Sequence, residues 1–237
     1  KASKAKWIAV DLETSSLDFR DDILGISLTV KRGDEYFPVY IPWHWFEDDS
    51  DISALLDKIL MNVDAMKILH NIDFDYQFLY WHGFTMDGKV VDTMMLARLL
   101  DENFSMGLKE RTWTMLDFGG YEVELEKYKF EHNFTKKSSY STIPVDVMAP
   151  YAAYDTYATY RLYEVMVPLA KAEHLMPLYN NIVMPVRMVE TEASINGLYV
   201  HMEQAERLDM RMTKALQSIE QKIYAYAGRE FNFNSTQ

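Results

Sequence analysis

Short apolar stretches, separated by polar or glycine-containing turns, open the chain. Residues 6–10, 22–30 and 35–41 are rich in β-branched and aromatic side chains. Runs of this length and composition predict strands, and their close succession predicts a meander. The chain therefore begins with three consecutive strands.

A different pattern follows, in which helical spacing alternates with short apolar runs. Residues 50–62 have helical apolar spacing, and residues 66–70 predict a short buried strand. A helix is predicted over 74–83, then a strand over 89–91 before a helix over 92–100. A meander followed by helix–strand alternation is typical of an α/β fold, with a mixed sheet and helices packed on it.

The remainder of the chain is mainly helical. We predict helices over residues 105–118, 144–174, 177–200 and 203–228, the third of them closed by an Asn-Gly pair. Residues 121–142 are charged and lack clear periodicity, so we predict an irregular surface segment there.

The composition limits the class of protein. The chain has 237 residues, 49% of them hydrophobic, enough for one sizeable domain or for one domain and the beginning of a second. It has no uncharged apolar run of about 18 residues. No apolar region follows its first residues either, so neither a membrane span nor a signal peptide is visible. We expect a soluble, cytoplasmic protein.

Charge and cysteine content restrict the candidate partners and metals. The formal net charge of -12 and the pI near 4.9 argue against a protein that grips duplex nucleic acid over a broad basic face. Solubility is the commoner explanation of such an acidic surplus. The chain has no cysteine, which fits a reducing cytosol, and any metal must be bound by oxygen or histidine.

Two acids, Asp11 and Glu13, stand at the end of the first predicted strand. Side chains two residues apart in a strand emerge on the same face. Burying two unpaired carboxylates there would be costly, whereas a divalent cation would favour both ionised forms. The alternative is a strand end that reaches solvent.

A second pair of acids, Asp73 and Asp75, follows a predicted strand-to-helix junction in "LHNIDFDYQFL". Such junctions lie at the ligand-facing edge of a sheet. Helix N-capping and favourable charge near the helix start explain Asp73. Asp75 lies further into the helix and is explained less well by capping, so it is the candidate site residue.

A third group lies in "YAAYDTYATY", where Tyr151 and Asp155 are four residues apart and share a helix face. A tyrosine–aspartate pair can also simply stabilise the helix. In a chain without cysteine, Asp11, Glu13, Asp75 and Asp155 together suit hard cations such as Mg²⁺ or Mn²⁺ rather than zinc.

These three motifs resemble, in order, the exonuclease motifs of one known family. "VDLETSSLD" is similar to the first motif of the DEDD-type 3′-5′ exonucleases, "HNIDFDYQFL" to the second and "YAAYDTYATYRLY" to the third. The resemblance is to the tyrosine subgroup, which forms the proofreading domain of family A DNA polymerases of the bacterial DNA polymerase I type. "VVDTMMLARLLDEN" and "GLKE" are similar to the segments between the second and third motifs.

The resemblance implies a fold and a domain division. It implies a ribonuclease-H-like mixed sheet flanked by helices, with a C-terminal helical extension. Residues 1–174 would form the exonuclease domain. Residues 175–237 would form the start of a polymerase domain, because "IVMPVRMVETEASINGLYV" and "FNFNSTQ" are similar to segments that enter it. The chain resembles a piece truncated before the fingers and palm, so we expect no polymerase activity from it.

The resemblance also implies a set of metal ligands and catalytic residues. Asp11, Glu13 and Asp155 would hold a catalytic metal ion, and Asp75 would help to hold a second ion to which Asp11 bridges. Tyr151, with Glu13, would orient the attacking water. The cofactors would be two divalent cations, Mg²⁺ or Mn²⁺.

Three further residues would bind substrate by the same resemblance. Thr14 and Leu17 would touch the 3′-terminal nucleotide, with Leu17 wedged against its base, and Asn71 would lie near the substrate. The implied function is removal of nucleotides from single-stranded or frayed 3′ ends of DNA, in a bacterial or phage-infected cell. DNA binding by this chain is expected to be weak and strongly salt-dependent.

Two alternatives remain open from the sequence. One is a 3′-5′ exoribonuclease of the same superfamily, with the same acids and tyrosine, although the polymerase-like tail from residue 182 onward argues against it. The other is a non-catalytic DNA-binding module. That interpretation would require the loss of at least one of the four acids, and all four are present.

Overall fold

The chain forms two units, Lys1–Ile195 and Asn196–Gln237. The computed structural model describes residues 2, 5–116, 118–135, 138–232 and 235. Of the helices in these parts of the chain, none combines the length and the apolar character that crossing a bilayer requires.

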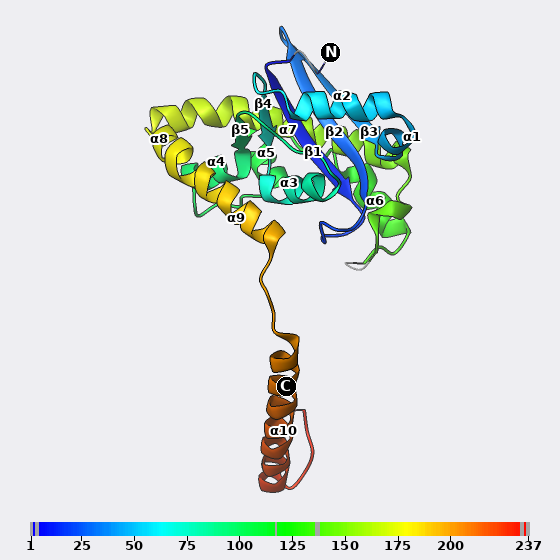
Figure 1. Ribbon diagram of the computed structural model, residues 1–237, viewed down its shortest axis with the longest axis vertical. Coiled ribbons are helices and arrows are strands. Elements are labelled where there is room, and N and C mark those ends of the chain that lie inside the picture. Colours follow the sequence, from blue (N-terminus) through cyan, green and yellow to red (C-terminus); the bar gives the residue numbers. More distant parts are fainter. Residues whose placement is uncertain (1, 3–4, 117, 136–137, 233–234, 236–237) are drawn as a thin grey trace. The chain divides into compact units, whose positions relative to one another are not determined.

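A five-stranded mixed sheet lies at the centre of the first unit (Figure 1), in the order β3-β2-β1-β4-β5. Its strands are β1 (Trp7–Thr14), β2 (Ile23–Arg32), β3 (Glu35–Pro42), β4 (Met66–Leu69) and β5 (Val90–Asp92). The first three strands pair antiparallel, while β1 pairs parallel with β4, and β4 with β5. The predicted meander and mixed sheet are confirmed.

The central strand β1 divides its side chains between the two faces of the sheet. Ile8, Val10 and Leu12 belong to the main hydrophobic core, to which helices α2 (Ser50–Leu60) and α3 (Ile72–Trp81) also contribute. Ala9 packs on the opposite face against Tyr160 of helix α7 (Val145–Ala172). The strand continues four residues beyond its predicted end at residue 10, so its two acids lie within it rather than after it.

Helix α7 approaches the sheet closely because small side chains line its inner face. Ala152, Thr156 and Thr159 are buried there, and the hydroxyls of Thr156 and Thr29 of β2 are 2.9 Å apart. A helix with large residues at these positions would stand further from the strands. This close approach brings the part of α7 that carries Asp155 next to β1.

The other helices of the first unit follow the predicted order, with additions. Helix α5 begins three residues later than predicted, and residue 117 lies outside the described residues. The predicted helix over 177–200 begins as a short helix and a π-helical turn. It ends at Asn196, the asparagine of the Asn-Gly pair that was predicted to close it. The bounds are α1 (His44–Asp48), α4 (Thr93–Leu100), α5 (Leu108–Leu116), α6 (Val123–Glu131), η2 (Tyr140–Thr142), α8 (Met176–Leu178), η3 (Tyr179–Val183) and α9 (Met184–Asn196).

The prediction of an irregular segment over 121–142 is wrong. The segment contains helix α6 and the short 3₁₀ helix η2, while residues 136–137 lie outside the described residues. Within α6, Leu125 is buried, whereas Val123 and Phe130 are exposed. Because apolar side chains lie on the solvent side as well as the core side, the sequence lacks the one-sided periodicity that reveals an amphipathic helix.

The second unit consists mainly of helix α10 (Met202–Ala227). The helix ends at Gly228, whose φ of 69° is the left-handed conformation that glycine adopts readily at a helix C-terminus. The predicted helix over 203–228 is therefore confirmed. The division at residue 174 and the assignment of residues 175–237 to a polymerase domain stay predictions.

Candidate active site

Three carboxylates from two elements meet beside the central strand. Asp11 and Glu13 share the face of β1 that carries Ala9, the face on which α7 packs. Asp155 lies on α7, and one carboxylate oxygen from each of the three acids lies within 4.8 Å of the others. The structure thus brings together residues that are far apart in the sequence.

The fourth predicted acid, Asp75, approaches the same strand from α3. Its Oδ1 accepts a hydrogen bond from the backbone N–H of Leu12 at 3.0 Å. This N–H is available because the pairing between β1 and β4 runs only from Trp7 to Ala9 on β1. The carboxylate of Asp75 is therefore fixed against the backbone between Asp11 and Glu13.

A lysine that the sequence did not single out lies among these groups. Lys109 Nζ, from α5, donates to both carboxylate oxygens of Asp155, at 2.7 and 2.9 Å, and to the Tyr151 hydroxyl at 2.8 Å. Its nitrogen also lies 4.4 Å from the centre of the Tyr151 ring. Lys109 therefore supplies a positive charge to the carboxylate cluster.

Two tyrosine hydroxyls border the cluster. Tyr151 lies one helical turn before Asp155 on α7, as the spacing predicted, and both contact Lys109. Tyr121 donates a hydrogen bond to Asp155 Oδ1 at 2.6 Å. Burial, followed by the negative charge of Asp155, raises the pKa of the Tyr151 hydroxyl far above its ordinary value. Tyr151 therefore stays a neutral phenol.

Burial raises the pKa values of the carboxyl groups. The pKa of Asp11 rises from 3.8 to about 8, first through burial and then through repulsion from Asp155, while Lys109 opposes the shift. The pKa of Glu13 is raised well above its ordinary value by burial and by Asp11. Burial and Asp11 likewise raise the pKa of Asp75. The ionised cluster lacks sufficient positive charge from the protein alone.

The donor chemistry of the cluster fits a hard divalent cation. All candidate ligand atoms are carboxylate oxygens, and these suit Mg²⁺ or Mn²⁺ better than soft metals. A divalent cation would favour the ionised forms that burial now disfavours. The three-oxygen group Asp11, Glu13 and Asp155 could therefore hold a metal ion, with Asp75 nearby.

A groove of about 1150 Å³ begins at Glu13 and runs between β1 and α6. Thr14 and Leu17, both predicted to bind substrate, line it, and Leu17 is 89% exposed. Lys129 and Phe130 of α6 line the opposite wall, and the Phe130 side chain is 85% exposed. The groove therefore carries apolar side chains beside the carboxylates.

Asn71, the third predicted substrate residue, lies at the start of α3. Its Oδ1 accepts a hydrogen bond from Arg187 of α9 at 2.6 Å. Asp73 was expected to cap this helix. Asn71 is the N-cap residue instead, but its side chain makes no capping hydrogen bond. The backbone N–H groups of Asn71 and Ile72 donate to the carboxylate of Asp92. Capping by Asp73 is therefore wrong, although its charge does lie in the first turn.

Sequence reasoning missed two side chains that contact Asp155. Lys109 falls in "GLKE", which resembled a family segment, but a lysine on a surface helix has no distinctive pattern. Tyr121 falls in the segment predicted to be irregular. Only the packing of α5 and the 118–123 segment against α7 reveals that both belong to the site.

Comparisons with known proteins relate the chain to a family and to individual relatives. The model of a family described as 3′-5′ exonuclease matches residues 1–171. The chain is 33% identical over 238 residues to the DNA polymerase of Escherichia phage T5, an alignment that covers 92% of this chain and 27% of the relative. The chain spans about a quarter of the length of the curated relatives it matches.

Solved structures share the fold. Pol1 from M. smegmatis, in a complex with DNA primer-template and dNTP, has a TM-score of 0.74 at 16% identity, covering 99% of this chain and 36% of that one. Brucella melitensis NrnC with bound Mg²⁺ has a TM-score of 0.61 at 19% identity, covering 85% of this chain and 93% of that one. The fold is therefore found both within a polymerase and in a protein of about this size.

Proposed function

The chain belongs to the 3′-5′ exonuclease family found in family A DNA polymerases, and from that membership we propose that it removes nucleotides from single-stranded or frayed 3′ ends of DNA. The observation that carries the proposal is the meeting of three carboxylates within 4.8 Å, on a strand and a helix that are distant in sequence. The reaction is hydrolysis of the terminal phosphodiester, and its biological role is proofreading.

Asp11, Glu13 and Asp155 would hold one divalent cation, Mg²⁺ or Mn²⁺, and Asp11 with Asp75 a second. Bound cations would neutralise charge on the attacking and leaving oxygens of the phosphodiester. The protein's own contribution is to keep three carboxylates within 4.8 Å of one another on β1 and α7, with Asp75 hydrogen-bonded to the backbone of the same strand. The fixed backbone contact of Asp75 supports this role because it limits the movement of that ligand.

Tyr151 would orient the attacking water by hydrogen bonding, together with Glu13. Its raised pKa supports an orienting role, because a phenol that stays protonated does not accept the proton of water. Its hydroxyl is already held at 2.8 Å from Lys109, which restricts its direction. Lys109 thus connects the orienting hydroxyl to the ligand Asp155.

The groove beside Glu13 would receive the 3′-terminal strand. Thr14 and Leu17 line it, and Leu17 exposes an apolar side chain that can wedge against a base. Stacking on exposed apolar and aromatic groups requires unpaired bases. This arrangement favours a frayed or single-stranded end over a paired one.

The family and the relatives also support a cellular setting for the reaction. The similar proteins come from a phage and from bacteria, where DNA replication takes place in the cytoplasm. We therefore propose that the chain acts on DNA 3′ ends as part of a DNA polymerase. The reaction would take place in the cytoplasm of a bacterial or phage-infected cell.

A nuclease assay tests the function. With a 5′-labelled single-stranded oligonucleotide and Mg²⁺ or Mn²⁺, the chain should give products shortened stepwise from the 3′ end, and EDTA should stop the reaction. Parallel reactions with RNA of the same sequence distinguish the exoribonuclease alternative.

Variants test the site. Asp155→Asn should abolish hydrolysis, whereas Asp146→Asn, at an exposed position in the first turn of the same helix, should leave it unchanged. Wild-type degradation by the double variant Asp11→Ala, Glu13→Ala would show that the carboxylate cluster is not the active site.

A further inference from the structure

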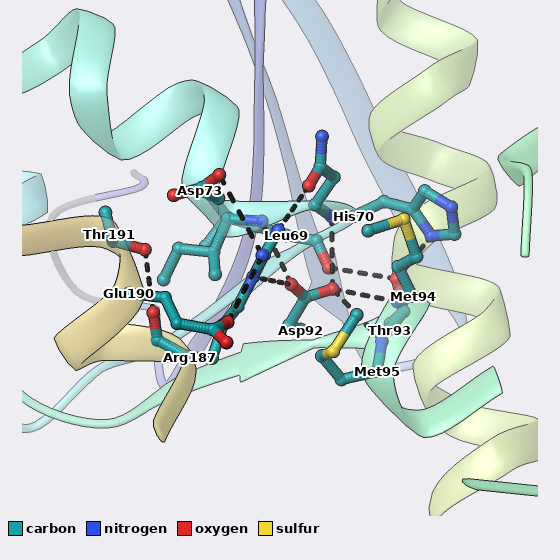
Figure 2. Close-up of polar contacts among 12 residues, drawn as sticks. Leu69, His70, Asp73, Asp92, Thr93, Met94, Met95, Arg187, Glu190 and Thr191 are labelled. Carbon is teal, nitrogen blue, oxygen red and sulfur yellow. Dashed lines mark hydrogen bonds and ion pairs between the residues drawn. The ribbon is translucent and has the colours of Figure 1, made fainter. Parts of the chain in front are cut away.

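Arg187 of α9 lies over the junction between β4 and α3, outside the carboxylate cluster. Figure 2 shows its guanidinium between Asp73 and Asp92. Its ion-pair distances are 3.8 Å to Asp73 Oδ2, 3.8 Å to Asp92 Oδ2 and 3.8 Å to Glu190 Oε2. The Arg187 side chain is only 14% exposed. Burying a charge to this extent costs free energy unless the charge is paired, so Arg187 requires partners at this position.

The nearest partner of the guanidinium is neutral. Nη2 of Arg187 donates to Oδ1 of Asn71 at 2.6 Å, more than 1 Å closer than any of its carboxylate contacts. Asp92 meanwhile accepts backbone N–H groups from the starts of both α3 and α4. Asp92 therefore holds the backbone of the junction, while Arg187 holds the side chain of Asn71.

The contact with Arg187 determines which way the Asn71 amide faces. Arginine has hydrogen-bond donors and no acceptor, so it must meet the amide oxygen. The amide nitrogen, with two N–H donors, then faces away from Arg187. Asn71 also has a φ of 79°, a left-handed conformation that asparagine adopts more readily than most residues other than glycine.

The oriented amide lies at the start of α3, the helix that carries the proposed metal ligand Asp75. Asn71 is the N-cap residue of α3, directly before the first helical residue, and Asp75 is four positions further along the chain. A donor group there suits the acceptor oxygens of a nucleotide, whereas the amide oxygen would not.

We propose that Arg187 is a positioning residue for the substrate. It holds the Asn71 amide so that the NH₂ group is presented to acceptor atoms of the 3′-terminal nucleotide. The inference rests on the proposed exonuclease function. It also means that the substrate site depends on α9, which lies beyond the residues 1–171 that match the family model.

Steady-state kinetics on a single-stranded oligonucleotide test the proposal, with wild type, Arg187→Gln, Asn71→Ala and the double variant. Arg187→Gln should raise KM about tenfold, because a hydrogen bond to a charged group is lost and such a bond is worth about this factor. The kcat should stay within about twofold of wild type. The double variant should be no worse than Asn71→Ala, because Arg187 acts through Asn71. Mn²⁺ affinity, measured by calorimetry, should not change.

Glu190→Gln is the matched control, because it removes an exposed ion-pair partner of Arg187 on the same helix. It should leave KM unchanged. Arg187→Lys keeps one donor for Asn71 and should recover part of the lost affinity. If Arg187→Gln does not fold, the same cycle is run with Arg187→Lys, for which an increase in KM is expected only when Asn71 is present.

Several results would overturn the proposal. One is a double variant in which the KM increases of the two single variants multiply. Another is an unchanged KM in Asn71→Ala. The third is an Arg187→Gln variant that loses Mn²⁺ affinity and kcat while its KM stays constant. The last would make Arg187 a support for Asp75 instead. A wild-type chain that does not shorten the oligonucleotide at all would refute the proposed function itself, an outcome distinct from these three.

Discussion

The ammonium nitrogen of Lys109 lies 2.7 and 2.9 Å from the two carboxylate oxygens of Asp155. Asp155 is 6% exposed at its side chain and lies in the group with Asp11 and Glu13. The lysine therefore supplies positive charge at the place where the proposed function requires a divalent cation. Its charge stabilises the ionised carboxylate and opposes the binding of another cation.

Replacing Lys109 with methionine should change metal-free stability and metal affinity in opposite directions. Without the ammonium group, Asp155 loses a charged hydrogen-bond partner, and the free energy of unfolding in EDTA should fall by about 1–3 kcal/mol. Mn²⁺ should bind at least about tenfold more tightly, because a competing positive charge is removed. Thermal unfolding in EDTA and calorimetric titration with Mn²⁺ measure the two effects.

Lys31→Met is the control for this variant. Lys31 forms an ion pair with Glu164 away from the cluster. Its replacement should alter stability equally with and without Mn²⁺ and leave metal affinity unchanged. Weaker Mn²⁺ binding by Lys109→Met would mean that the lysine supports the metal site rather than competing with it.

The raised carboxyl pKa values predict a pH-dependent stability in the absence of metal. The pKa of Asp11 rises from 3.8 to about 8, so between these values the folded chain holds a proton that the unfolded chain has released. The unfolded state then binds fewer protons, and stability falls as pH rises through this window. Glu13 and Asp75 shift in the same direction.

Added Mg²⁺ should cancel this loss of stability, because it favours the ionised carboxylates. The stabilisation by Mg²⁺ should therefore grow between about pH 5 and pH 8. Thermal unfolding with Mg²⁺ and with EDTA across this range measures it, and Asp11→Asn should show a smaller pH dependence. A stabilisation by Mg²⁺ that is constant with pH would contradict the proposed binding to these acids.

Tyr151→Phe should slow hydrolysis without loss of metal binding. The substitution removes only the hydroxyl that would orient water, so we expect kcat to fall by about tenfold to a hundredfold. The pKa of Tyr151 is raised far above its ordinary value, so no titration of this group should appear in the pH–rate profile of the wild type. A Mn²⁺ affinity that falls as steeply as kcat would show that Tyr151 acts on the metal instead.

Much of the fold follows from residue patterns that are local in the sequence. The alternation in β1 fixes which side chains share a face, and this alone places Asp11 and Glu13 together. The four-residue spacing of Tyr151 and Asp155 likewise fixes their common helix face. By contrast, α6 was missed because Phe130 is exposed, and exposed apolar residues conceal the helical period.

The parts of the site that were missed depend on contacts between distant elements. Lys109 meets Asp155 only because α5 packs on α7, and a lysine on such a helix looks like an ordinary surface residue. Arg187 meets Asn71 across 116 positions of sequence. Pairings of this kind are set by tertiary packing, so residue spacing in one sequence does not contain them.

Phe130→Ala should weaken binding of single-stranded DNA. Phe130 is 85% exposed on the wall of the groove that begins at Glu13, so its ring is available for stacking on a base. Stacking of a base on an aromatic ring contributes about 1–3 kcal/mol, and we expect the affinity to fall about tenfold. Because no charge is removed, the dependence of affinity on salt should keep its slope. Fluorescence anisotropy of a labelled oligonucleotide in EDTA measures both quantities.

Val123→Ala is the control for this variant, because Val123 is exposed on the same helix and does not line the groove; it should bind like wild type. Equal losses in the two variants would indicate a general effect on α6 and argue against the groove as the path of the strand.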